Sequence, residues 1–141
     1  MNTEHLHPML VHFPIALVIV GFGFELAYLL IKGEICFSKA GFYLLVLATM
    51  ASGFAWLSGY FLTGEMAGEA GKVKESHELS ATITTLSLIA SLVFRLIVLK
   101  TGLQKSLFKW ISFTLYGLAA VAVSITGFLG GRLVYEFMLP L

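Results

Sequence analysis

Four long apolar segments divide this chain, and they restrict the folds that it can adopt. They cover about residues 9–31, 40–62, 77–99 and 109–131. A bilayer core is ~30 Å thick, which about 20 residues of α-helix span at a rise of 1.5 Å per residue. Because a segment in lipid must satisfy its own backbone hydrogen bonds, each one is predicted to be a membrane-spanning helix.

The composition supports lipid as the solvent of this chain. Its 141 residues are 58% hydrophobic and 12% charged, whereas soluble domains contain about 25% charged residues. The connections between the segments are short, which predicts an all-α, up-down four-helix bundle in one domain. The net charge of +1 gives no reason to expect nucleic acid as a partner, and the single cysteine, Cys36, excludes an internal disulfide.

Local signals refine the expected helices. Pro8 suits a helix start, and Pro14 predicts a bend because it removes a backbone donor in the first turns. Glycines and charges at residues 63–76 indicate a solvated loop, with Ser76 as the N-cap of the third helix. The N-terminus has no basic region, so we expect it to be retained rather than cleaved as a signal peptide.

The distribution of basic residues predicts the orientation. The connections at 32–39 and 100–108, with the adjoining helix ends, carry six basic residues, and the opposite side carries three. The six are Lys32, Lys39, Arg95, Lys100, Lys105 and Lys109, and the three are Lys72, Lys74 and Arg132. Multi-pass insertion in a bacterial inner membrane, with both termini and all the histidines on the periplasmic side, is therefore predicted.

The four histidines are the main candidates for a site. His5, His7 and His12 stand at the start of the first span, and His77 stands at the start of the third. Histidine is costly in hydrocarbon and is a common ligand of metals and haem iron. One hypothesis makes His12 and His77 the axial ligands of one haem b, held across the bundle core.

Two other interpretations of the histidines stay open. His5, His7 and His12, with Met1 or Met9 and with His77 as a further candidate, would bind copper or zinc at the periplasmic surface. Alternatively, the histidines form hydrogen bonds at the headgroup level, the interpretation that we favour for His5 and His7. All four histidines lie on one side of the membrane. The chain therefore offers at most one bis-histidine haem and no route for electrons across the membrane.

Small and polar residues share a helical face with each of the two haem-ligand candidates, His12 and His77. The third segment has a face of His77, Ala81, Thr84, Leu88, Ser91 and Arg95, and the first has Ala16, Gly23 and Ala27 near the face of His12. Such faces are predicted to point into the bundle. They serve either close helix packing or the accommodation of a flat cofactor.

Glu25 and Arg95 are the two ionisable residues expected to lie within the spans near their cytoplasmic ends. They could form an intramembrane ion pair, or each could extend to the cytoplasmic interface. A proton-relay role for Glu25 is a further option.

The opening segment HPMLVHFPIALVIVGFGFE, together with His77 and the closing GGRLVYE, resembles a bacterial membrane family, domain of unknown function 2231. The matched positions are His7, Pro8, His12, Phe13, Pro14, His77, Gly130, Gly131, Leu133, Val134 and Tyr135. The family looks like a relative of four-helix b-type cytochromes, which implies a haem and electron transfer beside respiratory proteins. A histidine is expected soon after Tyr135, where this chain has Glu136 and Phe137, so this member departs from the pattern at that point.

The chain has no GxSxG, HExxH, P-loop or GxGxxG motif, so an electron carrier or accessory subunit is favoured over a stand-alone enzyme. The leading hypothesis is a b-type cytochrome-like electron-transfer protein that exchanges electrons with a quinol or a periplasmic cytochrome. The alternatives are a cofactor-free accessory subunit of a respiratory complex and copper or zinc binding. Partner subunits or a homo-oligomer are expected because so much lipid-facing surface is available.

Overall fold

A computed structural model gives the fold of residues 6–31, 34–102 and 107–138, and these ranges are all helix or short connections. The helices are α1 (Leu6–Leu10), α2 (His12–Leu30), α3 (Ile35–Leu62), α4 (Gly68–Thr101), α5 (Leu107–Arg132) and the π-helical η2 (Leu133–Met138). Four stretches are long and apolar enough to cross a membrane: His7–Leu30, Ile35–Leu62, Gly68–Thr101 and Leu107–Phe137. The prediction of an all-α chain with four membrane-capable helices is confirmed.

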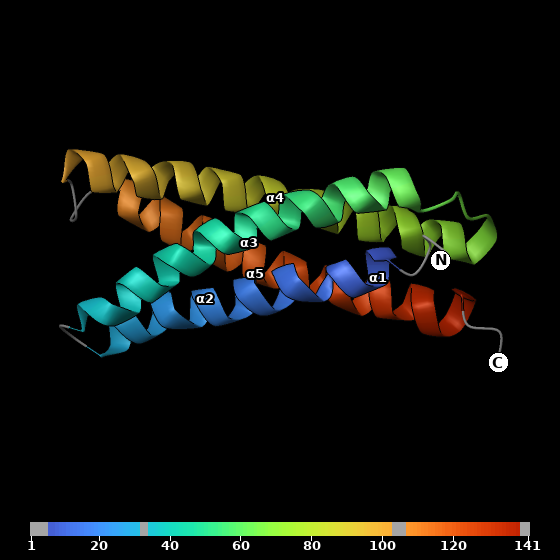
Figure 1. Ribbon diagram of the computed structural model, residues 1–141, viewed down its shortest axis with the longest axis horizontal. Coiled ribbons are helices and arrows are strands. Elements are labelled where there is room, and N and C mark those ends of the chain that lie inside the picture. The colour runs from blue at the N-terminus through green and yellow to red at the C-terminus, as the bar shows by residue number, and fades with distance from the viewer. Residues whose placement is uncertain (1–5, 32–33, 103–106, 139–141) are drawn as a thin grey trace.

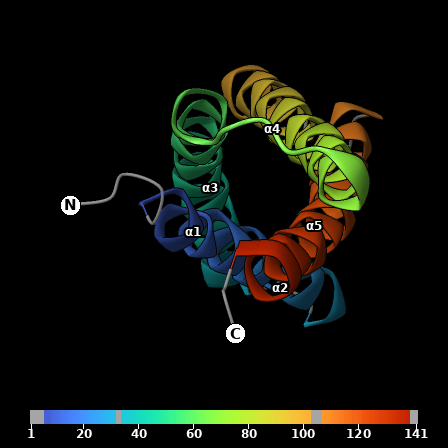
Figure 2. The same ribbon diagram turned by 90° about the vertical axis from the view of Figure 1, so that its right-hand side faces the viewer.

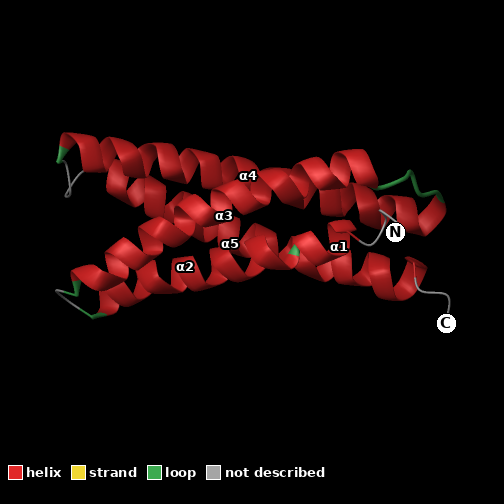
Figure 3. Ribbon diagram, in the orientation of Figure 1, coloured by secondary structure: helices red, strands yellow, loops and turns green. Residues whose placement is uncertain are grey.

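The first span is interrupted between α1 and α2, at Val11 (Figure 3). The cause lies at Pro14, whose ring occupies the place of the donor that would bond the carbonyl of Leu10. The backbone amides of Val11 and Ile15 still bond the carbonyls of His7 and Val11, at 3.2 and 3.4 Å. The interruption is limited to Val11, which keeps right-handed helical dihedral angles (φ −66°, ψ −20°), so His7–Leu30 forms one membrane-capable span.

Helix α4 begins earlier than predicted. It starts at Gly68, which has a positive φ of 66°, so the connection from α3 is limited to 63–67. Ser76 was expected to cap the helix, but it lies inside α4 and its hydroxyl donates to the carbonyl of Lys72. The prediction was wrong because half of the polar segment 69–76 is Lys or Glu, which favour helix in water. Lys74 and Glu78 also pair one turn apart on its surface.

The helices form two antiparallel hairpins that pack side by side, α2 with α3 and α4 with α5 (Figures 1 and 2). Contact is most extensive within the hairpins, and the contacts of α3 with α4 and of α2 with α5 are less extensive. Helix α1, the α3–α4 connection and η2 lie at one end of the bundle (Figure 1). We call this the histidine end, because it contains His7 and His77, and we call the other the ion-pair end, for Glu25 and Arg95.

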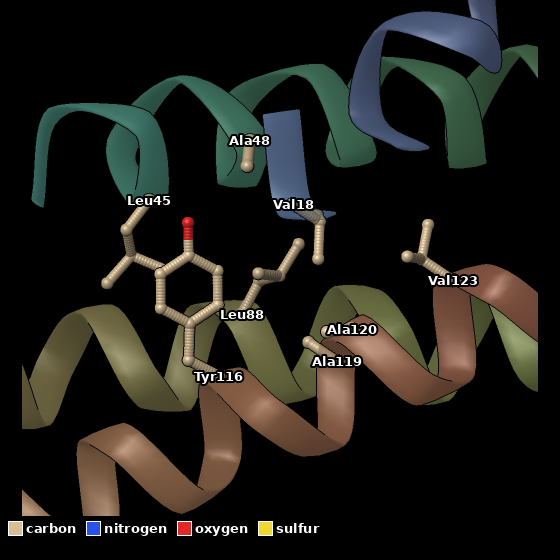
Figure 4. Packing of buried hydrophobic residues seen from close by; sticks show 8 residues of the cluster. All are labelled: Val18, Leu45, Ala48, Leu88, Tyr116, Ala119, Ala120 and Val123. Carbon is tan, nitrogen blue, oxygen red and sulfur yellow. The ribbon is translucent and has the colours of Figure 1, made fainter. Parts of the chain in front are cut away.

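The core is a narrow seam of small and medium apolar residues from all four long helices, grouped around Leu88 and Tyr116 (Figure 4). Its members are Val18, Leu45, Ala48, Leu88, Tyr116, Ala119, Ala120 and Val123. Large apolar side chains elsewhere are mostly exposed on the outer faces, as expected where lipid, and not water, surrounds the helices.

The polar face of α4 points inward as predicted and packs on α5. His77, Ser80, Thr84, Ser87, Ser91 and Arg95 are all buried. Ser91 and Ser112 each donate a hydroxyl to the other's backbone carbonyl, at 2.8 and 2.9 Å. Thr126 bonds Ser80 at 2.9 Å. Reciprocal bonds of this kind satisfy polar groups in a membrane interior and hold the helices of the second hairpin together.

The predicted inward face of the first span was wrong. Ala16 and Gly23 are exposed, and the buried residues of α2 are Pro14, Val18, Gly21 and Glu25. A helix turns about 100° per residue, so His12 and Glu25, thirteen positions apart, point about 220° apart around the axis. Only one of them can face the core, and hydrocarbon tolerates exposed Ala and Gly far better than an exposed carboxylate.

Candidate functional site

His7 is held in place by α3, the neighbouring helix of its hairpin. Its Nδ1 lies 2.8 Å from Oγ of Ser58. The hydroxyl of Ser58 donates its only proton to the carbonyl of Ala55, at 2.8 Å. When Ser58 gives this proton to Ala55, it accepts from His7, and in that arrangement Nδ1 carries the ring proton and Nε2 has a free lone pair.

His77 reaches the same state through a backbone partner. Its Nδ1 lies 3.0 Å from the carbonyl oxygen of Thr126 in α5. A carbonyl accepts and never donates, so the neutral ring is protonated at Nδ1 and Nε2 again has a lone pair. This arrangement, with Nδ1–H bonded to protein and Nε2 unprotonated, is the one in which imidazole binds metals.

The two rings meet between the hairpins. Their centroids are 6.2 Å apart and their planes are at 89° to each other. Each ring lies against a glycine of the opposite helix in its own hairpin. A methyl group on residue 59 would lie 3.0 Å from Cε1 of His7, and one on residue 130 would lie 3.1 Å from Cε1 of His77. Gly59 and Gly130 thus provide the space in which the imidazoles sit.

His12, predicted to pair with His77, does not meet it. The residue is exposed and its Nδ1 lies 2.7 Å from the carbonyl oxygen of Pro8. The structure instead brings His7 to the ring of His77. His7 and His12 are five residues apart and point about 140° apart around the helix, so His7 faces inward where His12 faces outward. His5, the remaining candidate ligand, lies outside the described residues.

Glu25 and Arg95 come together at the ion-pair end. Nη2 of Arg95 lies 3.3 Å from Oε1 of Glu25, and the two side chains are 8% and 9% exposed. Arg95 also donates to the hydroxyl and, at 3.4 Å, to the carbonyl of Ser38. Gly41 gives the carboxylate room, since a methyl group there would lie 2.7 Å from Oε1. Neither side chain extends to the interface, which was the competing expectation.

Sequence reasoning treated His7 as an interfacial residue and so missed it as the partner of His77. The sequence signal for His7 was on another helix, α3. There Ser58 supplies a hydroxyl to the His7 ring, and the adjacent Gly59 leaves space for it. The closing motif carries a comparable signal, because its Gly130 contacts His77 while its Tyr135 is exposed.

Coordination number limits what the site can bind. Within residues 6–31, 34–102 and 107–138, no group of three or more His, Cys, Asp or Glu side chains could hold a metal ion. Zinc sites in proteins use three or four protein ligands. Haem iron needs only two, because the porphyrin supplies the other four nitrogens. Two facing imidazoles therefore fit a haem iron better than a zinc ion.

Comparison with known proteins identifies a family of membrane proteins. A family model described as "Predicted membrane protein (DUF2231)" matches residues 3–140. No curated protein and no solved structure matches the chain. The family description mentions a membrane but neither haem nor electron transfer.

Proposed function

The chain belongs to the DUF2231 family of predicted membrane proteins, and from the arrangement of its histidines we propose that it is an electron-transfer protein with one haem b. His7 and His77 are the proposed axial ligands, in place of the pair His12 and His77. The observation that carries the proposal is that one imidazole from each hairpin meets the other with Nδ1 bonded to protein.

The spacing of the rings supports this assignment. Metal–imidazole bonds are about 2.0 Å long, so two rings on opposite sides of one metal have centroids roughly 6 Å apart. The separation of His7 and His77 is 6.2 Å. A flat porphyrin would have to separate the hairpins at this point, and the contacts between the hairpins are less extensive than the contacts within each. Iron in this setting accepts and releases single electrons.

The protein residues have separate tasks in this proposal. Ser58 and the carbonyl of Thr126 fix the orientation and tautomer of the two rings. Such outer partners raise the basicity of a ligating imidazole and keep it aimed at the metal. Gly59 and Gly130 keep the rings close to the helix backbones, so that neither ring blocks the gap between the hairpins.

The site lies at one end of the bundle only. The ion-pair end contains no histidine among its described residues, so we propose exchange with a partner on the histidine side. With the orientation that the basic residues predict, this is the periplasmic side of a bacterial inner membrane, and the partner is a quinol or a periplasmic cytochrome.

A copper ion bound directly by the two imidazoles is the second candidate. The ring spacing favours it, because a single ion fits between His7 and His77 without any separation of the hairpins. The two candidates differ in their absorption spectra and in their metal content.

The proposal is tested with the full chain, expressed with ample haem and purified in detergent. We expect a Soret band and, on reduction with dithionite, the sharp α band of a six-coordinate b-type haem, with close to one haem per chain. Copper without haem would favour the second candidate. Preparations without haem or metal, but with stoichiometric partner proteins, would indicate a cofactor-free accessory subunit and refute both.

A further inference from the structure

A small cavity borders the buried ion pair. Glu25, Arg95 and Tyr116 line it, with Ser112, Lys109 and the aromatic rings of Trp110 and Phe113. Its volume is about 10 Å³, which suits a single water molecule and nothing larger. This cavity lies at the opposite end of the bundle from the two histidines.

Two polar atoms of residues that line the cavity lack partners in the described part of the chain. Nε of Arg95 and the hydroxyl of Tyr116 are both fully buried, and neither has a hydrogen-bond partner among the described residues. Tyr116 is 1% exposed and Arg95 is 6% exposed. Buried polar groups are almost always paired with protein or with ordered water, because an unsatisfied donor costs about 1–3 kcal/mol.

Two other polar side chains that line the cavity have partners of their own. The hydroxyl of Ser112 donates to the carbonyl of Ser91 at 2.9 Å. The ammonium of Lys109 lies 5.0 Å from the ring centroid of Tyr28, over its face. The hydroxyl oxygen of Tyr116 lies against Gly21, so close that a side chain on residue 21 would overlap it.

We propose that this cavity is a binding site for one ordered water molecule. The water accepts hydrogen bonds from Nε of Arg95 and the hydroxyl of Tyr116, and it donates to the carboxylate of Glu25. Three bonds are the usual number for a buried water. A small anion is disfavoured because the Glu25 carboxylate borders the same space. The site joins α2, α4 and α5 at the ion-pair end and does not depend on the proposed haem.

Nuclear magnetic resonance of the full chain in nanodiscs tests this directly. Arg95 and Arg132 are the only arginines in the sequence, so arginine labelling gives two Nε–H signals, and Arg132→Lys assigns them. We expect a cross-relaxation signal between Hε of Arg95 and a long-lived water. Its absence, or a shift of the Arg95 signal when chloride replaces a larger anion, would overturn the proposal.

A matched pair of tyrosine variants provides an independent readout. If the water is bound, Tyr116→Phe removes one of its partners and should lower Tm by about 2–4 °C. If the cavity is dry, the same change removes an unsatisfied hydroxyl and should raise Tm, which would contradict the proposal. Tyr43→Phe, at an exposed position on α3, should leave Tm unchanged. Should Tyr116→Phe fail to fold, the wild-type magnetic resonance signal decides alone.

Discussion

Replacing Arg95 by leucine is expected to lower the free energy of unfolding by about 3–5 kcal/mol, the largest stability effect of any single substitution considered for this chain. The change leaves the carboxylate of Glu25 buried without the guanidinium that lies 3.3 Å away. It also removes the donors to Ser38. Unfolding in mixed detergent micelles, followed by circular dichroism, measures the loss.

The control is the double substitution Glu25→Leu with Arg95→Leu. Removing both charges abolishes the desolvation cost along with the attraction, so the double variant should recover most of the stability lost in the single one. A single variant within about 1 kcal/mol of wild type would show that the pair is solvated, as surface pairs are, and would contradict its burial.

Replacing His77 by alanine is expected to weaken haem binding at least about 100-fold, and His7→Ala should do the same. Loss of a ligand must cost at least as much as loss of its outer hydrogen-bond partner, which typically costs 10–100-fold. Ser58→Ala removes the hydrogen-bond partner of His7. Its haem affinity should therefore lie between that of the histidine variants and that of the wild type. Haem titration followed by absorbance gives the affinities, and circular dichroism confirms that the variants are folded.

His12→Ala is the matched control, since it alters an exposed histidine on the same span, whose ring bonds the carbonyl of Pro8 in that span. It should bind haem with wild-type affinity. Loss of haem in His12→Ala, with retention in His7→Ala, would restore the pairing predicted from sequence and refute the assignment made here.

The architecture was predictable from sequence because hydrophobicity and length alone specify a membrane helix. The inward face of α4 was equally predictable, since Ser91, Thr84 and Arg95 share one helical face and such polar groups are unfavourable in lipid. The start of α4 could not be predicted in this way. Residues 69–76 are polar, and hydropathy does not distinguish a polar helix from a loop.

The sequence led us to expect a histidine of the first span beside His77, and the ring that lies there is that of His7. His77 lay on a polar face and was recognised, whereas the choice between His7 and His12 depended on the rotation of α2. Glu25 sets that rotation by requiring the interior, and His7, eighteen residues or five full turns before it, shares its face. Spacing along this helix reveals the choice only after Glu25, and not His12, is taken to face the interior.

Electron paramagnetic resonance of the oxidised, haem-loaded protein tests the pairing of His7 with His77 most directly. The planes of the two rings are at 89°, and perpendicular axial imidazoles give low-spin ferric haem a strongly anisotropic signal with a large maximal g value. We predict that signal in the wild type. A rhombic low-spin signal, typical of parallel rings, or a high-spin signal from a single axial ligand would contradict the account.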